Sequence, residues 1–577
     1  MMTGKWDMGE KPDQDAQVRG FEMTKGLLLP GGDTHYISDK NGKVNTTLPP
    51  SYYQDLNRTS PYSESGQEVT QFPPNAYSTE YYTDSAIALL QNRDISRPFA
   101  LNVAHIAPHT PWQAPPEVSA KYIETYSKGW DVLRQERFER LKASGILPVD
   151  AKLPSRPEGL RAWDSLTPTE QSVEAKRMVV YAAMIEMLDN SVGRLLNYLK
   201  TSGEYENTVI LVYSDNGAES VAAALAYEPS RSATIKNFNT LEAGDFDPNK
   251  LANIGDASWY FGPNKEWAML SNTPFNKHKV TLFDGGFHVP AFIHYPQAKV
   301  SGIKYDCMHS ILDFMPTILD MADTSYPTTW NDKPLSPLPG VSMAGLFQGN
   351  FSCNADRWLT LEFEGMKAVR HAGWALSQAR FDNTLHLFNL EQDPYERNDL
   401  AAQRPDKLAE LFDHYQQYAE ENQVVEVSGR WYPPLNTVST ATANTDAGVY
   451  GGVASNGIPL WLKAVNAKQS DILDVGGFVH IAKEHVGNPG EFFVHIKYTQ
   501  SDDMPPVYFA LTDQGLHKQS TAEGLPTFQA GTLPRSLPIP IYQGTLVDIP
   551  GTFEILIGYR VDDTEVLGSD PIILTVE

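Results

Sequence analysis

A helical pattern followed by an uncharged run marks the middle of the chain. Between Val173 and Lys200, apolar residues recur every three or four positions, the spacing of one face of an amphipathic helix. That face consists of Val180, Met184, Leu188, Val192, Leu195 and Leu199. Gly203 then acts as a stop signal, and Thr208–Tyr213 contains no charge and is mostly β-branched or large and apolar. The run predicts a strand buried on both faces of a parallel sheet, so that helix, loop and strand form half of a βαβ unit.

Shorter apolar runs predict further elements on both sides of this unit. Strands are expected at 99–104, at 285–296 as a short buried strand after a glycine turn, and near 366–370 and 385–390. Helices are expected over 311–322, with Pro316 near the start or at a kink, and over about 404–422. The charged run 134–140 is interpreted as a solvated helix face, and 220–270 as an irregular insertion. The predicted fold class is α/β, with a mainly parallel sheet flanked by helices.

The composition changes after the last of these helices. Residues 428–456 are rich in Ser, Thr, Ala, Asn and Gly without periodicity, which predicts a linker or surface loop. Short strand-like runs separated by turn residues follow at 492–498, 507–511, 553–559 and 572–576. They predict a β-sandwich. The expected organisation is an α/β domain over 1–427 with a small subdomain from about 340, a linker over 428–456, and an all-β domain over 457–577.

Charge and cysteine content narrow the possible partners. The formal net charge of −25 disfavours a nucleic-acid or anionic-membrane partner, although a local basic pocket could still hold an anion. No stretch approaches the apolar length of a membrane span. Cys307 and Cys353 fit no metal motif and could pair with each other. The oligomeric state stays open.

Three segments carry candidate chemistry. Asp215 and Asn216 directly follow the predicted strand, and their oxygens are hard ligands suited to Ca²⁺ or Mg²⁺. The alternative interpretation is an ordinary turn after a strand. His109 follows the strand at 99–104 and could bind an anion or donate a proton, or it could simply be tied into its Pro-rich loop; His105 is assigned to this structural role. Lys279 precedes a glycine turn and could hold an anionic ester, or it could be an ordinary surface lysine.

Taken together, these segments resemble the sulfatases of the alkaline-phosphatase-like superfamily. The matching segments occur in the family's order: Gly4-Lys5-Trp6, Ala107-Pro108-His109-Thr110-Pro111, 181–189, Ser214-Asp215-Asn216-Gly217, Gly285-Gly286 with Val289-Pro290, 313–319, and Asp393-Pro394 with Asn398 and Leu400. Residues 259–262 and 267–268 look like the bacterial arylsulfatase branch. The resemblance covers about residues 1–422 and does not extend to the region from about 457.

The resemblance implies a role for each candidate residue. Asp215 and Asn216 match downstream ligands of a divalent cation, usually Ca²⁺. Lys5, His109 and Lys279 match residues that grip the sulfate group of a small-molecule or glycan sulfate ester. Such cationic groups would stabilise the charge that builds up as the ester bond breaks, and His109 could protonate the leaving oxygen.

Two departures from the family pattern change what is expected of this chain. Asp7 stands where the family normally has His, so that role is altered or lost. The Cys/Ser-x-Pro-x-Arg motif that yields the formylglycine nucleophile is absent, as is the upstream metal-binding Asp pair. Both normally precede Gly4-Lys5-Trp6, so the first strand of the central sheet should be absent with them. We therefore expect either an N-terminally truncated sulfatase, periplasmic or secreted when full-length, or a shortened inactive homologue.

Either expectation predicts little or no sulfatase activity for these 577 residues. Two other functions stay open. One is a phosphomonoester or phosphonate hydrolase, although the pattern of Lys5 and Lys279 favours sulfate. The other is a non-catalytic binding protein whose C-terminal β domain binds glycan or packs against the rest. Aromatic side chains gathered on an exposed face of that domain would favour glycan binding.

Overall fold

The computed structural model describes the chain except for a set of segments and single positions, which are 10–11, 29–33, 47–59, 221–252, 380–383, 425–433, 441–444, 456–457, 331, 350, 352, 355, 364, 446, 502, 535 and 563. Most of the predicted insertion at 220–270 lies outside the described residues. In the described part of the chain, no helix is both long enough and apolar enough to cross a bilayer.

A five-stranded mixed sheet forms the N-terminal part. Its order is β4 (Gln67–Glu68), β3 (Tyr62–Glu64), β2 (Thr24–Leu28), β1 (Met2–Lys5) and β5 (Asn102–Ala104). β1 is parallel to both of its neighbours, whereas β3 is antiparallel to β2 and to β4. Because β1 and β5 are parallel, the segments that follow them leave the same edge of the sheet. This edge brings the residues after Lys5 and after Ala104 to one side of the molecule.

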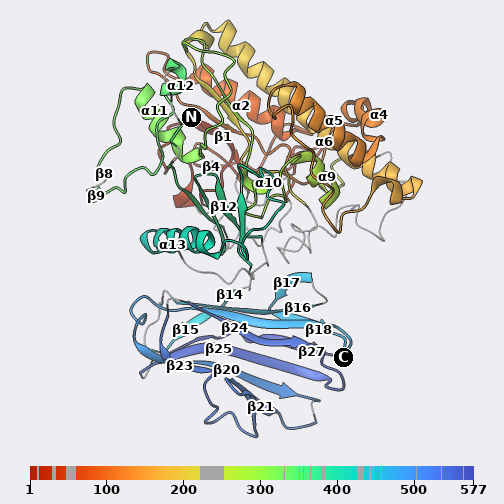
Figure 1. Cartoon of the computed structure of the whole chain (residues 1–577), viewed down its shortest axis with the longest axis vertical. Helices are drawn as coiled ribbons and strands as arrows, with labels where there is room; N and C mark the ends of the chain where they lie inside the picture. Colours follow the sequence, from red (N-terminus) through yellow and green to blue (C-terminus); the bar gives the residue numbers. More distant parts are fainter. Residues whose placement is uncertain are drawn as a thin grey trace.

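Helix α2 (Ser78–Asn92) packs on this sheet, and the long helix α6 (Pro168–Thr201) packs on α2. α6 begins before the predicted Val173 because Thr167 and Glu170 form a capping box. Val180 and Met184 of the predicted apolar face are fully buried. α3 (Pro116–Ser119) and α4 (Ile123–Tyr126) contact α6, and α5 (Gly129–Ala143) contacts α9 (Lys265–Ser271). Figure 1 shows α4, α5 and α9 near α6. The helical and α/β character predicted for this part is therefore confirmed.

The strand before Ser214 differs from its prediction. β6 (Ile210–Tyr213) pairs antiparallel with β7 (Ala291–His294) in a separate two-stranded sheet. Neither strand buries a residue among the described part of the chain, and the exposed fractions of Tyr213 and Phe292 are 41% and 61%. An uncharged apolar sequence indicates that burial of the strand would be favourable. Burial also requires another element that packs on the strand, and the local sequence does not reveal one. The predicted parallel pairing of β6 and burial of both strands are therefore wrong.

A disulfide bond links the two ends of the stretch of chain that follows β7. This stretch comprises α11 (Phe314–Met321), β8 (Thr329–Trp330), β9 (Lys333–Pro334) and α12 (Gly345–Gln348). Pro316 lies near the start of α11, where a missing N–H costs no helical hydrogen bond. Cys307 and Cys353 form a disulfide with a Cα–Cα distance of 5.3 Å, which answers the open question of whether they pair.

A small antiparallel sheet follows. Its strands are β10 (Leu359–Phe363), β11 (Met366–His371), β12 (Trp374–Ser377) and β13 (His386–Asn389). Leu411 and Tyr415 of helix α13 (Pro405–Glu421) pack on this sheet against Val369, Leu376 and Leu387. The predicted strands near 366–370 and 385–390 and the predicted helix at 404–422 are confirmed.

The C-terminal region consists of two layers of strands, which lie below α13 in Figure 1. One layer contains β14 (Pro434–Leu435), β16 (Gly448–Ser455), β17 (Ile458–Leu462), β19 (Leu473–His480) and β24 (Ser536–Gly544). The other contains β15 (Thr437–Ser439), β18 (Ala464–Ala467), β20 (Pro489–Thr499), β21 (Val507–Thr512), β22 (Gly515–Gln519), β23 (Gln529–Thr532), β25 (Gly551–Val561), β26 (Thr564–Gly568) and β27 (Ile572–Val576). A single apolar core fills the space between the layers.

The predicted linker at 428–456 contains three of these strands, β14, β15 and β16. Its glycines and small residues hide the strand pattern, because they reduce the contrast between buried and exposed positions. Gly451 shows why small residues are needed here: a Cβ atom at this position would lie 2.6 Å from the side chain of Ile572. The described strands of the β region thus begin at Pro434, ahead of the predicted boundary at 457.

Candidate active site

Close backbone packing joins the segment 214–219 to the glycine turn near Lys279. The N–H of Gly217 donates to the carbonyl oxygen of Gly286 at 2.8 Å, and the N–H of Lys279 donates to that of Ala218 at 3.0 Å. A Cβ atom at Gly217 would lie 1.9 Å from the carbonyl oxygen of Gly285, so only glycine permits this approach. Asn272, at the end of α9, accepts from the N–H of Ala218 at 2.7 Å. Segments far apart in the sequence therefore pack together and form one wall of the candidate site.

A carboxylate lies between two of the predicted anion-binding residues. Glu219 Oε2 is 3.8 Å from Lys279 Nζ and 3.9 Å from His109 Nε2. The exposed fractions of the three side chains lie between 13% and 24%, so the cluster is half-buried but reachable from solvent. The structure thus brings His109 and Lys279 together, as the predicted shared role requires. Glu219 itself was not predicted.

The imidazole of His109 is oriented by its own loop. Its Nδ1 lies 2.6 Å from the carbonyl oxygen of Thr110, which can only accept, so Nδ1 carries the proton and Nε2 faces Glu219. The fully buried His35 helps to fix this loop in place, because its Nε2 lies 2.9 Å from the carbonyl oxygen of His109. Sequence reasoning missed His35, since a lone His outside any periodic or motif-bearing segment gives no pattern.

Lys5 ends β1 and forms an ion pair with Asp7. The distance from Lys5 Nζ to Asp7 Oδ2 is 3.3 Å, and their exposed fractions are 26% and 58%. Asp7 therefore partly neutralises the lysine instead of adding the second cationic group that the family pattern provides. Lys5 leaves the same sheet edge as the segment that leads from β5 to His109.

Asp215 and Asn216 present oxygen atoms on the loop before Gly217. Asp215 Oδ1 accepts from the N–H of Asn216 at 2.9 Å, which leaves Oδ2 for another partner. Asn216 Nδ2 donates to the carbonyl oxygen of Gly217 at 3.0 Å, so Oδ1 is the side-chain atom that could bind a cation. Both donors suit Ca²⁺ in kind, but Ca²⁺ takes six to eight ligands. No group of three or more His, Cys, Asp or Glu able to hold a metal occurs among the described residues, so these two donors do not complete a site.

A buried charged network fastens the Lys279 turn to the small antiparallel sheet. Arg370 of β11 donates to Asp284 Oδ1 and to Glu396 Oε1, both at 2.8 Å. Glu396 Oε2 accepts from the N–H of Asp284, and its carbonyl oxygen accepts from Asn276 Nδ2. Burial raises the pKa of Glu396 to about 7. For Asp284 burial also acts upward, but Arg370 and His288 outweigh it and lower the pKa to about 2. The network therefore fixes residues 276–284 against the small antiparallel sheet.

His105 has the structural role expected of it. Burial lowers its pKa to about 4, so its ring is neutral near pH 7. Its ring lies 6.2 Å from that of Tyr82, a fully buried residue of α2. His105 therefore belongs to the packing under the sheet and not to the anion-binding group.

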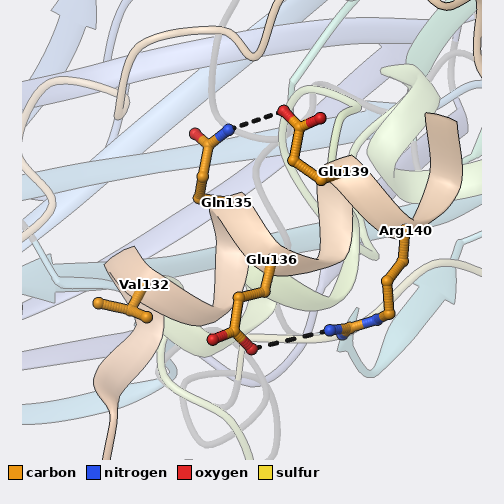
Figure 2. A pocket seen from close by; sticks show the side chains of 5 residues that line it. All are labelled: Val132, Gln135, Glu136, Glu139 and Arg140. Carbon is orange, nitrogen blue, oxygen red and sulfur yellow. Dashed lines mark hydrogen bonds and ion pairs between the residues drawn. The ribbon is translucent and has the colours of Figure 1, made fainter. Parts of the chain in front are cut away.

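The hollow shown in Figure 2 contains none of these residues. Its lining consists of Val132, Gln135, Glu136, Glu139 and Arg140, all from α5. A hydrogen bond between Gln135 and Glu139 and an ion pair between Glu136 and Arg140 run along the helix surface. The solvated face predicted for 134–140 is present, except that Arg134 and Phe138 point inward and are buried. One helix face without convergent polar groups from other elements does not make a binding site.

Comparison with known proteins identifies the family of the chain. The sequence model of the family described as Sulfatase matches residues 1–324. An uncharacterised sulfatase of Schizosaccharomyces pombe is 31% identical over 434 residues, covering 74% of this chain and 75% of the relative. The arylsulfatase of Klebsiella aerogenes is 30% identical over 347 residues, covering 60% of this chain and 70% of the relative.

Solved structures give a weaker likeness. The crystal structure of Ps i-CgsB in complex with k-i-k-neocarrahexaose is 20% identical, covers 74% of this chain and 72% of that chain, and has a TM-score of 0.45. The family match alone spans more than half of the 577 residues. The chain therefore belongs to the sulfatase family.

Proposed function

We propose that this chain binds the sulfate group of a sulfate monoester at Lys279, His109 and Lys5. The observation that supports the proposal is the cluster of His109 and Lys279 around Glu219, on the wall formed by Gly217 and Gly286. Half-buried ammonium and imidazole groups attract an anion more strongly than fully exposed ones, because water screens them less. Their fixed backbone positions reduce the entropy lost on binding.

Each residue has a separate task in this proposal. Lys279 and Lys5 would stabilise the charge on the sulfuryl oxygens as point charges. His109, when protonated at Nε2, would place an acidic proton beside the bridging oxygen of the ester. The Nδ1–H bond to Thr110 keeps the ring in the orientation that this task needs.

We further propose that Asp215 and Asn216 supply two oxygen donors to a divalent cation, with Ca²⁺ the expected ion. A bound cation would add positive charge beside the sulfate group. Since two donors fall well short of a full set, we expect this chain to bind Ca²⁺ weakly. No step of the reaction is derived through the ion.

Hydrolysis by this chain is expected to be small or absent. The sequence contains no Cys/Ser-x-Pro-x-Arg motif, so the covalent nucleophile expected for the family is not supplied by these residues. The proposal is thus a sulfate-ester site of arylsulfatase type that binds ester without efficient turnover.

Calorimetric titration of the 577-residue protein with phenyl sulfate, in buffer containing Ca²⁺, tests the binding site. We expect Lys279→Ala to weaken binding about tenfold or more, because charge-assisted hydrogen bonds are lost. Lys497→Ala is the matched control, since Lys497 pairs with Glu554 in the β region at 2.6 Å. Unchanged binding in Lys279→Ala would refute the site, and robust hydrolysis of phenyl sulfate by the wild type would refute the proposed inactivity.

A glycan-binding role for the β region is the second candidate, and one observation disfavours it. The exposed large apolar side chains described there are Val438, Ile472, Val486, Met504, Leu516, Val547, Ile549 and Ile573. None of them is aromatic, whereas sugar-binding faces usually offer aromatic rings. We therefore favour a packing role for this region.

A further inference from the structure

Both lysines of the proposed site have a carboxylate partner within the chain. Glu219 Oε2 lies 3.8 Å from Lys279 Nζ, and Asp7 Oδ2 lies 3.3 Å from Lys5 Nζ. Each carboxylate cancels the formal charge of its lysine. Apart from a protonated His109, these side chains therefore give the site no net positive charge, which is unusual for a site that must hold an anion.

Glu219 forms no hydrogen bond with Lys279 or His109. Its distances to Lys279 and His109 both exceed the length of a hydrogen bond, so this carboxylate lowers the local positive potential without occupying their donors. The exposed fraction of the Glu219 side chain is only 13%, so water screens its charge incompletely. An ester oxygen that reaches both Lys279 and His109 would also lie close to Glu219.

We infer that Glu219 is a specificity-determining residue that makes the site select singly charged esters over doubly charged ones. This inference rests on the proposed function. A sulfate monoester carries one negative charge, whereas a phosphate monoester carries close to two at about pH 7.5, because its second pKa is about 6. The additional charge meets the repulsion of Glu219. Selection therefore arises from a repulsive group that penalises the wrong ligand more than the right one.

A purely structural role for Glu219 predicts a different result. If Glu219 only holds Lys279 and His109 in place, its removal weakens or strengthens both kinds of ester by the same factor. If Glu219 selects by charge, its removal changes the ratio of the two affinities. The ratio is therefore the quantity to measure.

The experiment compares the dissociation constants of phenyl sulfate and phenyl phosphate at about pH 7.5, measured by calorimetry on the full chain in the presence of Ca²⁺. We expect the wild type to prefer phenyl sulfate. Glu219→Gln should strengthen phenyl phosphate binding about tenfold and phenyl sulfate binding clearly less, so the preference falls. Glu219→Asp keeps the charge and should keep most of the preference. Glu554→Gln, which removes a carboxylate from the Lys497 pair, should leave the ratio unchanged.

Thermal unfolding of each variant shows whether it is folded. If both esters bind and Glu219→Gln leaves their affinity ratio unchanged, the inference is overturned while the proposed function stands. If neither ester binds to the wild type, the proposed function fails and the inference fails with it. If Glu219→Gln does not fold, the Glu219→Asp variant decides: a lost preference despite the retained charge contradicts charge selection.

Discussion

At the scale of single residues, Asp313 shows how a buried carboxylate organises the chain beyond the site. Its side chain is completely buried and accepts from both Arg357 Nη atoms at 2.7 Å. The backbone N–H groups of Ser310 and Val341 donate to it at 2.9 Å each. Burial acts to raise the pKa of Asp313, but the nearby His309 and the hydrogen bonds from Arg357 and the backbone outweigh it and hold the pKa well below its usual value.

This low pKa predicts a loss of stability in acid. An unfolded aspartate has a pKa near 3.9, so below about pH 4 the unfolded chain binds a proton that the folded chain resists. The stability from Asp313 is thus present above about pH 4 and is lost as the pH falls toward the folded pKa. Asp313→Asn should abolish this part of the acid loss. It should also cost about 3–5 kcal/mol near neutral pH, because the charge of the largely buried Arg357 loses its partner.

Urea unfolding at a series of pH values measures both effects. Asp164→Asn is the control, since Asp164 is exposed on a short helix. The same free energy of unfolding and the same acid slope in Asp313→Asn and the wild type would contradict this account.

At the scale of elements, local patterns predicted α6, α13 and the C-terminal strands β20, β21, β25 and β27, but not α2. α6 buries Val180, Met184 and Leu199 of its predicted apolar face, and α13 buries Leu411 and Tyr415. β20 and β25 alternate between core and outer face. β6 was mispredicted because its apolar sequence is compatible with burial that the described residues do not provide. β16 was missed because glycine and alanine give no alternation.

The candidate site was predictable in part, because two of its residues adjoin recognisable local sequence patterns. His109 follows a recognisable strand signal and Lys279 precedes a recognisable glycine turn, and the structure brings them together. Their meeting at Glu219 depends on the contact between Gly217 and Gly286, which joins two distant segments. A carboxylate two residues beyond a turn motif has no distinctive sequence pattern of its own. Glu219 could therefore be identified as a site residue only from the structure.

The disulfide is an element-scale constraint on the segment that contains α11 and α12. Cys307 and Cys353 are separated by 46 residues. A crosslink closing a loop of that length removes chain entropy from the unfolded state worth up to about 4 kcal/mol. We expect Cys307→Ser with Cys353→Ser to lower the free energy of unfolding by about 2–4 kcal/mol, measured in urea. A reducing agent should lower the stability of the wild type similarly and leave the double variant unchanged; stability insensitive to both changes would contradict the prediction.

At the scale of the whole molecule, the C-terminal strands form a unit with their own core. Every residue of the main β-region cluster lies between Leu435 and Val576. β16 pairs with β19 from Gly448 to Ser455, and its Val449 and Val453 are fully buried in that cluster. The segment from 434 to 456 is therefore part of the sandwich in both pairing and packing.

This organisation predicts that a fragment spanning 434–577 folds alone and that one spanning 457–577 does not. The shorter fragment loses β14, β15 and β16, which leaves the long edge of β19 unpaired and removes Leu435, Val449 and Val453 from the core. Each of these buried side chains contributes about 1.5–3 kcal/mol, so their combined loss approaches the whole stability of a small domain. Circular dichroism in a urea series should give one cooperative transition for 434–577 and none for 457–577. Equal cooperative folding of both fragments would show that β16 is dispensable, and no transition in either would show that the β region depends on contacts with the sulfatase part.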